Sequence, residues 1–363
     1  LIRKGLVDRG FVESRTEGFD ELAAMVADYT PERVAEICGI DARDLEAAAE
    51  MYAMAEHAPI VYCLGVVEHS TGTEGVMALS NLALAAGKLG RPGCGINPLR
   101  GQNNVQGACD MGAGPADFTG YQKVPNPEMR AKFEAAWGVE LNQAAGLKAT
   151  ECFPAMIDGR IRGLFLFGED PVRTDPDTGH VIRALESLDF FVCEELFMTE
   201  TAKYADVILP GRSYAEKEGT FTNTERRVQR VRKAVDGPAG ARLDTEVFAD
   251  IMRRMGYDQP TLTGAQLMDE VASLTPSYAG ISHARLDSAA VAGQGLQWPC
   301  TGPDHPGTRI MHEGAFSRGL GGYSLAQYRP SAEQPDEEFP LIMMTGRVLA
   351  QYNAQAMTGR TEG

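Results

Sequence analysis

The stretch Ile161-Arg-Gly-Leu-Phe-Leu-Phe-Gly168 decides the fold class. It is a short apolar run that ends in glycine, and this pattern predicts a buried strand of a parallel sheet. Two further strands are predicted at residues 190–193 and 205–210, with a helix at 180–187 and a helical turn at 199–204 between them. Strands that alternate with helices indicate the Rossmann-like βα units of an α/β fold with a parallel sheet.

The chain upstream predicts another such unit. Residues 20–56 are predicted to be helical, and Thr30-Pro31-Glu32 supplies the N-cap, the proline and the acidic residue that begin a helix. The apolar run Pro59-Ile-Val-Tyr-Cys-Leu-Gly65 predicts a buried parallel strand, and residues 72–89 are compatible with a helix. Residues 90–120 are rich in Gly, Asn, Pro and Gln and have almost no periodicity, which predicts a long loop with a function.

The length of the chain predicts a multi-domain α/β protein. At 363 residues it exceeds the usual size of a single core. We expect an α/β domain at 1–102, a second α/β domain with inserted loops at 103–335, and the start of a further domain at 336–363. The first strand of this last domain is predicted at 339–345. Because the chain lacks an initiator Met and begins like the middle of a helix, we expect a fragment of a longer protein.

The composition argues against several classes of protein. A formal net charge of −16 does not suit nucleic-acid binding, which usually needs a basic face. No run of about 18 uncharged apolar residues exists, so we expect no transmembrane helix and a cytoplasmic location. The cysteine count of 7 is odd, no two cysteines form a CxxC pair, and the 6 histidines lack metal-ligand spacing. We therefore predict no disulfide framework and no metal ligand within this chain.

Polar residues follow two predicted strands of the second domain. They are Glu169, Asp170 and Thr174 after the strand 161–168, and Glu194 and Glu195 after the strand 190–193. Ligands of parallel sheets bind outside the carboxyl ends of the strands, where carboxylates can accept from a ribose or from the N–H groups of a guanine ring. The alternative is that these residues cap helix N-termini. The chain has no GxGxxG or Walker motif, so an ordinary dinucleotide or ATP site has little support.

Arg100 is the strongest candidate for a substrate-binding residue. It lies in the segment Asn97-Pro-Leu-Arg-Gly-Gln-Asn-Asn-Val-Gln-Gly-Ala-Cys-Asp-Met-Gly112. A guanidinium can offer a planar pair of donors to a small carboxylate and can stabilise charge that develops on it. The alternative is a surface arginine in a polar turn. The amide side chains that could serve a polar heterocycle are Gln102, Asn103, Asn104 and Gln106.

Two further groups of residues are candidates for cofactor contacts. Residues 216–229 mix Gly, Thr and Asn, and Thr220, Thr222 and Asn223 suit contacts to phosphate or pterin. The alternative for this segment is a solvated hairpin. The second group follows the last predicted strand and consists of Arg347, Gln351 and Asn353.

Taken in order, these segments resemble the large catalytic subunit of bacterial formate dehydrogenases, within the wider molybdopterin oxidoreductase family. The resemblance covers nearly the whole chain. It includes Gly168-Glu-Asp-Pro171, Ala205-Asp-Val-Ile-Leu-Pro210, Glu218-Gly-Thr-Phe-Thr-Asn223 and Met344-Thr-Gly-Arg347. The Arg-Gly-Gln-Asn-Asn loop that begins at Arg100 is the most discriminating segment, because it is similar to formate dehydrogenases rather than to nitrate or sulfoxide reductases.

The resemblance implies the domains of the formate dehydrogenase and DMSO reductase fold, with residues 336–363 as the start of a β-barrel-like domain. It also implies a molybdenum or tungsten ion held by bis-molybdopterin guanine dinucleotide. Formate would be oxidised to CO2, and the electrons would pass through a 4Fe-4S cluster to iron–sulfur, flavin or NAD-linked subunits. The cysteines of the cluster and the Cys or selenocysteine ligand of the metal match no residue of this chain. Both are expected before Leu1, and the fragment alone is expected to be inactive.

The resemblance also assigns roles to individual residues. Arg100 would orient formate, Gln102 would lie against a pterin, and Gly65 would belong to the loop that faces the cofactor. The residues that would line one guanine-nucleotide site are Gly168, Asp170, Thr174, Glu194 and Asp244. The residues that would contact a pterin from the last domain are Arg347, Gln351 and Asn353, where the sequence departs from the His-containing version of some relatives.

Two alternatives stay open at this point. The chain could be part of another molybdopterin oxidoreductase that acts on a different small substrate. It could also be a non-catalytic homologue that binds the cofactor or another subunit. A cluster-type set of cysteines followed by a Cys or selenocysteine upstream of Leu1 would favour an enzyme.

Overall fold

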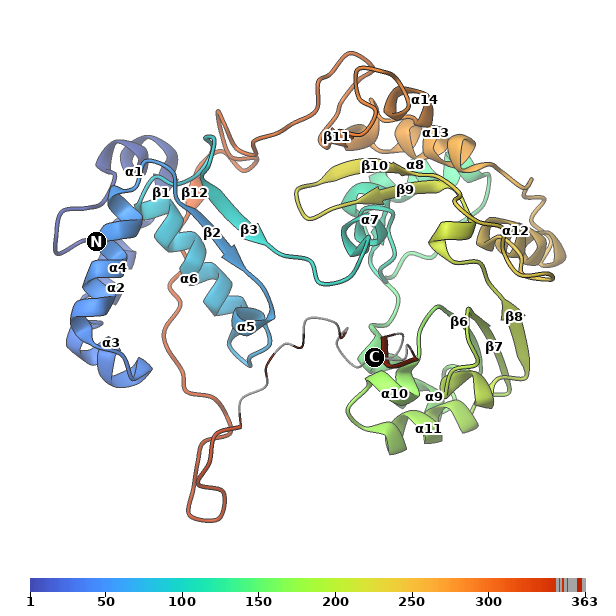
Figure 1. Ribbon diagram of the computed structural model, residues 1–363, viewed down its shortest axis with the longest axis horizontal. Coiled ribbons are helices and arrows are strands. Elements are labelled where there is room, and N and C mark those ends of the chain that lie inside the picture. The colour runs from blue at the N-terminus through green and yellow to red at the C-terminus, as the bar shows by residue number, and fades with distance from the viewer. Residues whose placement is uncertain (344–345, 347, 349–350, 352–357, 361–363) are drawn as a thin grey trace. The chain divides into compact units, whose positions relative to one another are not determined.

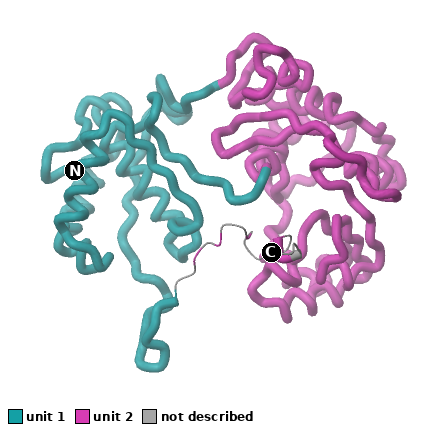
Figure 2. The backbone as a smooth tube through the Cα atoms, in the orientation of Figure 1, with its two compact units in different colours: residues 1–103, 308–343 teal, residues 104–307, 344–363 magenta. Residues whose placement is uncertain are grey.

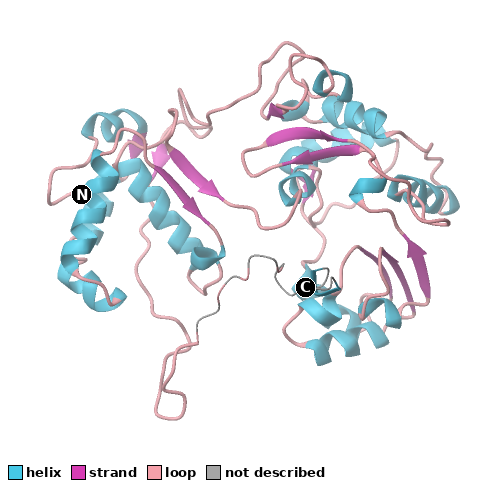
Figure 3. Ribbon diagram, viewed as in Figure 1, coloured by secondary structure: helices cyan, strands magenta, loops and turns pink. Residues whose placement is uncertain are grey.

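The computed structural model describes residues 1–343, 346, 348, 351 and 358–360, which belong to two compact units (Figure 2). Unit 1 consists of residues 1–103 and 308–343, and unit 2 contains residues 104–307 and the described residues that follow 343. Each unit has at least one small parallel sheet with helices beside it (Figures 1 and 3), so the predicted α/β class is confirmed. No helix in these ranges is long and apolar enough to cross a membrane.

Unit 1 is mainly helical. Its helices are α1 (Arg9–Arg15), α2 (Phe19–Val26), α3 (Pro31–Cys38), α4 (Ala42–Met54), α5 (Leu64–Val67) and α6 (Gly72–Ala85). Its strands are β1 (Thr16–Glu17), β2 (Pro59–Tyr62), β3 (Gly95–Pro98) and β12 (Gly321–Gly322). The parallel pairs are β1 with β12 and β2 with β3.

The helical region predicted at residues 20–56 is confirmed as three helices whose ends are set by local chemistry. The Thr30 side chain accepts a backbone N–H of the first turn of α3, and Pro31 occupies the first helical position. Gly39 ends α3 at a φ of 68°, a left-handed conformation that costs glycine little. The Asp41 side chain then caps α4 in the same way as Thr30 caps α3.

Two predictions for unit 1 need correction. Residues 59–62 do form a parallel strand, but the strand is not buried, since Val61 is 56% exposed. The sheet has only β2 and β3 in the described ranges, and two strands cannot bury both faces as a larger parallel sheet does. The long loop predicted at 90–120 is interrupted by β3 and by the helix α7 (Val105–Asp110). The sequence did not predict these two elements, because their polar residues give little apolar periodicity.

Unit 2 contains the remaining elements. Its helices are α7, α8 (Pro127–Trp137), α9 (Ala149–Ile157), α10 (Pro171–Thr174), α11 (Thr178–Glu186), α12 (Asp244–Arg254), α13 (Gly264–Leu274) and α14 (His283–Leu286). The 3-10 helices are η1 (Thr119–Tyr121), η2 (Thr201–Tyr204), η3 (Tyr214–Glu216), η4 (Pro276–Tyr278) and η5 (Thr358–Arg360). The strands are β4 (Asp117–Phe118), β5 (Gln122–Lys123), β6 (Gly163–Phe167), β7 (Phe190–Glu195), β8 (Val207–Pro210), β9 (Gly219–Thr222), β10 (Arg227–Val231) and β11 (Leu296–Gln297).

The sheet β6-β7-β8 is parallel throughout, as the sequence predicts. Leu164 and Leu166 of β6 pack into a core with Val181 and Leu185 of α11. The alternate residues Phe165 and Phe167 belong to the other face, because side chains alternate along a strand. Their rings lie 5.7 and 5.5 Å from the ring of Phe248 in α12. Helices therefore cover both faces, and the carboxyl edge of the sheet is left for polar residues.

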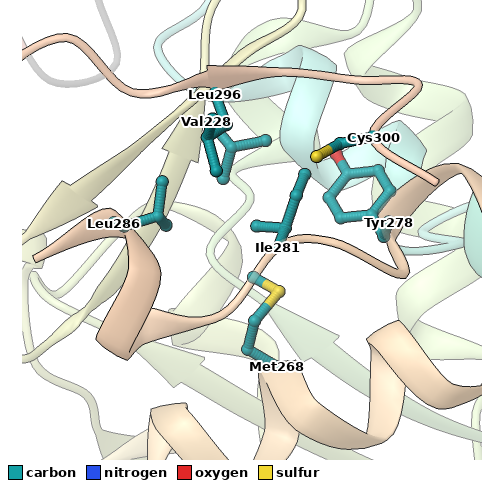
Figure 4. Close-up of a cluster of buried hydrophobic side chains, with 7 residues drawn as sticks. All are labelled: Val228, Met268, Tyr278, Ile281, Leu286, Leu296 and Cys300. Carbon is teal, nitrogen blue, oxygen red and sulfur yellow. The ribbon is translucent and has the colours of Figure 1, made fainter. Parts of the chain in front are cut away.

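A second sheet has the order β11-β10-β9 and is antiparallel. Its apolar side chains pack against α13, η4 and α14 in the core drawn in Figure 4. The members of this core are Val228, Met268, Tyr278, Ile281, Leu286, Leu296 and Cys300. Residues 219–222 and 227–231 do form a hairpin, but it is packed on this core rather than solvated as considered for residues 216–229.

The strand predicted at 339–345 is not formed by residues 339–343. Leu341 is 87% exposed and Met343 is 86% exposed. A strand needs a hydrogen-bonding neighbour, and no described strand pairs with these residues. Residues 344 and 345, which complete the predicted strand, lie outside the described residues.

Candidate functional site

Gly65 and Arg100 lie at the carboxyl edge of the β2–β3 sheet in unit 1. Because the two strands are parallel and Tyr62 is in register with Pro98, their carboxyl ends meet. The Leu99 backbone N–H donates to the Tyr62 carbonyl at 2.8 Å, which extends the pairing up to Arg100. Gly65 follows the end of β2 in α5, and both Gly65 and Arg100 are exposed. The structure thus brings these two predicted residues to one edge of unit 1.

The amide side chains after Arg100 divide into two kinds. Gln102 and Asn103 are exposed, as a ligand contact requires. Gln106 is buried and donates to Asp110 at 2.8 Å, so its expected role toward a heterocycle is replaced by a structural one. Asn104 accepts the Thr222 backbone N–H at 2.9 Å.

A cluster of carboxylates lies at the carboxyl edge of the β6-β7-β8 sheet in unit 2. Gly168 follows β6 with a φ of 66°, and its N–H donates to the Glu194 carbonyl at 3.0 Å. Asp170 is 4% exposed. Its Oδ1 accepts from the Thr201 backbone N–H and hydroxyl, at 3.0 and 2.7 Å, whereas its buried Oδ2 has no hydrogen-bond partner in the described part of the chain. Thr174, at the end of α10, is exposed, and its N–H donates to the Asp170 carbonyl.

Glu194 is the most unusual member of this cluster. It belongs to β7 rather than following it, and it is 1% exposed. Neither carboxyl oxygen has a hydrogen-bond partner among the residues with described positions. Burial, together with the negative charge of Asp244, raises the pKa of the Glu194 carboxyl to about 7, and the positive charge of Lys217 opposes the rise. The site therefore contains a carboxyl group that is readily protonated near neutral pH.

Asp244 begins α12 and forms an ion pair with Lys217. Both residues line a cavity of about 530 Å³, which Thr220 of β9 also lines. Sequence reasoning did not single out Lys217, because a lysine between two glutamates is typical of a solvated surface. Of the two other candidates in this hairpin, Thr222 is buried, and the Asn223 side chain accepts two backbone N–H groups of its own turn.

The candidates near the end of the chain are only partly described. Gln351 accepts a hydrogen bond from the Thr358 hydroxyl at 2.8 Å. Arg347 and Asn353 lie outside the described residues.

Comparison with known proteins identifies the family. The family model of the molybdopterin oxidoreductases matches residues 23–254, which is more than half of the chain. The chain belongs to the molybdopterin oxidoreductase family. Acetylene hydratase from Pelobacter acetylenicus has a similar fold, with a TM-score of 0.57 and 22% identity over 78% of this chain and 41% of that protein.

Among curated relatives of this molybdopterin oxidoreductase chain are formate dehydrogenase subunits. It is 47% identical to the F420-dependent formate dehydrogenase 2 subunit alpha of Methanococcus maripaludis, over 100% of this chain and 53% of that protein. It is 38% identical to formate dehydrogenase H of Escherichia coli, over 99% of this chain and 50% of that protein. The chain thus spans about half the length of these relatives, and the resemblance to formate dehydrogenases is confirmed.

The carboxylate cluster contains buried acceptors that a bound cofactor with N–H donors could satisfy. Asp170 Oδ2 and both Glu194 oxygens are buried acceptors without donors among the described residues. A buried acceptor left without a partner costs free energy, and a guanine ring offers N–H donors that could satisfy it. No three His, Cys, Asp or Glu side chains within the described ranges are arranged to hold a metal ion.

We expect Glu194 to make the cofactor-free protein less stable as the pH rises. Its pKa is about 7 in the folded protein, against 4.5 for a glutamate in water, so the folded protein holds a proton that the unfolded chain releases. The free energy of unfolding therefore has its full value from this group below pH 4.5. It falls by about 2 kcal/mol, after allowance for solvent screening, as the pH rises through 7. Glu194→Gln should flatten this part of the profile, measured as thermal unfolding of the cofactor-free full-length protein between pH 5 and 8.

Glu186→Gln provides the control for this titration, because Glu186 is an exposed residue of the neighbouring helix α11. It should keep the wild-type dependence on pH. A profile that is the same in wild type and Glu194→Gln would show that Glu194 does not take up the proton.

Proposed function

We propose that this chain is part of the catalytic subunit of a formate dehydrogenase. The substrate would be formate, and the reaction converts HCOO⁻ to CO2, one proton and two electrons. The bound cofactor would be bis-molybdopterin guanine dinucleotide with molybdenum or tungsten, which supplies the two-electron acceptor. A 4Fe-4S cluster outside this chain and electron-transfer subunits would carry the electrons away. A cytoplasmic location is part of the same proposal.

The observation that carries the proposal is the position of Arg100. The side chain of Arg100 is exposed at the carboxyl edge of the β2–β3 sheet. The preceding residue, Leu99, is bonded to the sheet through its backbone N–H, which donates to the Tyr62 carbonyl. A guanidinium at a fixed point can bind the two oxygens of formate and orient the C–H bond. The names of the relatives described above support formate as the substrate.

Other residues of the chain would hold the cofactor. Gly168, Asp170, Thr174, Glu194 and Asp244 would line the guanine-nucleotide site, and the Asp170 and Glu194 oxygens that lack donors would accept from the base. Gly65 and Gln102 would face the cofactor in unit 1. Arg347, Gln351 and Asn353 would contact a pterin. The segment that begins at Arg100 would then orient the formate through Arg100 and the neighbouring pterin through Gln102.

The full-length protein provides the test. We expect it to reduce a viologen dye when formate is added, and to contain molybdenum or tungsten together with guanine nucleotide. Metal and guanine nucleotide in the purified protein with no response to formate, but turnover of another small substrate, would contradict the formate assignment. Absence of both metal and nucleotide would favour a non-catalytic homologue.

A further inference from the structure

The Cys63 side chain links the carboxyl ends of β2 and β3 within unit 1. β2 ends at Tyr62 and α5 begins at Leu64, so Cys63 lies where the chain turns away from the sheet (Figure 1). Cys63 is the N-cap of α5, yet its side chain makes no capping hydrogen bond to that helix. The Cys63 Sγ instead donates to the Leu99 carbonyl at 3.1 Å, across 36 residues.

The thiol supplies a donor at the point where β2 leaves the backbone ladder. The Leu99 N–H donates to the Tyr62 carbonyl at 2.8 Å, which continues the ladder one residue beyond β3. In a parallel pair the next bond would run from the second residue after Tyr62 to the Leu99 carbonyl. That residue is Leu64, which already belongs to α5. The Cys63 thiol therefore takes the place of a backbone donor.

The two hydrogen bonds together fix both peptide groups of Leu99. The Leu99 carbonyl shares a planar peptide group with the Arg100 N–H, so the thiol also sets the orientation of the backbone at Arg100. Packing restrains this backbone little, because residues 97–100 are all exposed and Leu99 is 49% exposed. Hydrogen bonds, rather than buried side chains, hold the point from which the Arg100 side chain projects.

We propose that Cys63 is a positioning residue for formate, acting through the Leu99 carbonyl to hold the backbone of Arg100 in one orientation. The inference rests on the proposed function for its substrate, whereas the hydrogen bond does not depend on it. Cys63 does not touch formate in this scheme. A guanidinium with a fixed attachment point loses less entropy when a ligand binds, so the thiol contributes to the binding of formate rather than to the chemical step.

The test uses the cofactor-loaded full-length enzyme. Cys63→Ala removes the donor, and Cys63→Ser retains a hydroxyl donor on the same carbon atom. We expect Cys63→Ala to raise the KM for formate about three- to fivefold with kcat changed less than about twofold, the order expected when one weak hydrogen bond is lost. Cys63→Ser should keep the KM close to the wild-type value.

A double-mutant cycle with Arg100 distinguishes positioning from a general structural role. If Cys63 acts through Arg100, Cys63→Ala should raise the KM in the wild-type background and leave it unchanged in the Arg100→Ala background, because the group that it positions is then absent. A change that only loosened unit 1 would raise the KM by the same factor in both backgrounds.

Cys94→Ala is the matched control. The Cys94 thiol also donates to a backbone carbonyl of unit 1, that of Glu56 at 3.7 Å, and both cysteines are partly exposed. Cys94 precedes β3, so it lies at the opposite end of the sheet from Arg100. Cys94→Ala should therefore leave the KM for formate unchanged.

Hydrogen–deuterium exchange gives a readout that does not depend on turnover. The Leu99 N–H is bonded to the Tyr62 carbonyl, and this bond opens more often when the neighbouring carbonyl loses its donor. The Leu99 N–H should therefore exchange faster in Cys63→Ala than in wild type, Cys63→Ser or Cys94→Ala.

The possible outcomes separate the two proposals. An unchanged KM in Cys63→Ala, an equal rise in Cys94→Ala, or the same rise in the Arg100→Ala background would overturn the positioning role. If the wild-type enzyme does not oxidise formate, the proposed function fails and the assignment of formate fails with it. Faster exchange of Leu99 in Cys63→Ala would in that case retain the thiol as the anchor of the Arg100 backbone, and unchanged exchange would reject the anchor as well.

Discussion

Replacing Arg100 with alanine in the full-length protein is expected to lower kcat/KM for formate about 10²- to 10³-fold, as the loss of one donor to a developing charge typically does. The physical reason is that the guanidinium binds the carboxylate in a planar, paired geometry and orients it before reaction. Arg100 is exposed beyond the end of β3, so the substitution leaves the packing of the strand intact. Steady-state dye reduction at varied formate concentration measures the effect.

Two further variants separate geometry from charge. Arg100→Lys keeps the charge but loses the paired donors, and it should recover only part of the activity. Arg43→Ala serves as the control, because Arg43 is also an exposed arginine of unit 1 and pairs with Asp41 at the start of its own helix. Added guanidinium should partly restore Arg100→Ala. Wild-type kinetics in Arg100→Ala would exclude the arginine from substrate binding.

Much of the local structure could be predicted, because it depends on residues close together in the sequence. The three strands of the parallel sheet in unit 2 were recognised from apolar runs, and Thr30 was recognised as a helix cap. Contacts between distant segments leave no such local signal. The pairing of β1 with β12 joins Thr16 to Gly321, and no pattern in either two-residue strand predicts it. Exposure of β2 also depends on how many strands surround it, which periodicity does not report.

The candidate site also has features that the local sequence predicts and features that depend on contacts between distant segments. Asp170 and Glu194 were found because they follow predicted strands, where ligands of parallel sheets bind, whereas Asp244 was assigned only by the family resemblance. The sequence could not distinguish Asp170, which bonds to Thr201 through one oxygen, from Glu194, whose two oxygens lack partners in the described ranges. Lys217 was missed because its ion pair with Asp244 spans 27 residues. Burial and pairing, rather than residue type, separate the carboxylate oxygens that are bonded within the fold from those that lack donors among the described residues.

Asp110 is a case in which a buried carboxylate is fully used by the fold. It is 0% exposed at the end of α7. Its Oδ1 accepts from Gln106 Nε2 at 2.8 Å and from the Tyr121 hydroxyl at 2.7 Å. Its Oδ2 accepts from the Tyr278 hydroxyl at 2.5 Å and from Trp298 Nε1 at 2.7 Å. The burial of Tyr278, together with the negative charge of Asp110, raises the pKa of the Tyr278 hydroxyl and keeps it a donor.

Asp110→Ala should therefore lower the free energy of unfolding by about 3–5 kcal/mol, because it removes the acceptor of four hydrogen bonds, among them that of the buried Tyr278 hydroxyl. Asp110→Asn should cost less, since one amide oxygen still accepts. Denaturant unfolding of the full-length protein measures the loss. Hydrogen–deuterium exchange should place it in residues 105–112 and 276–281.

Two comparisons test whether the hydrogen-bond network is the cause. Asp304→Ala removes an exposed carboxylate of unit 2 and should leave stability unchanged. Tyr278→Phe removes one of the four donors, so its combination with Asp110→Ala should cost less than the sum of the single changes. Additive losses would show that Asp110 and Tyr278 stabilise unit 2 independently. Since the N-cap of α7 is Asn104, whose Oδ1 accepts the Thr222 N–H, a loosened Asp110 anchor should also speed exchange at that N–H.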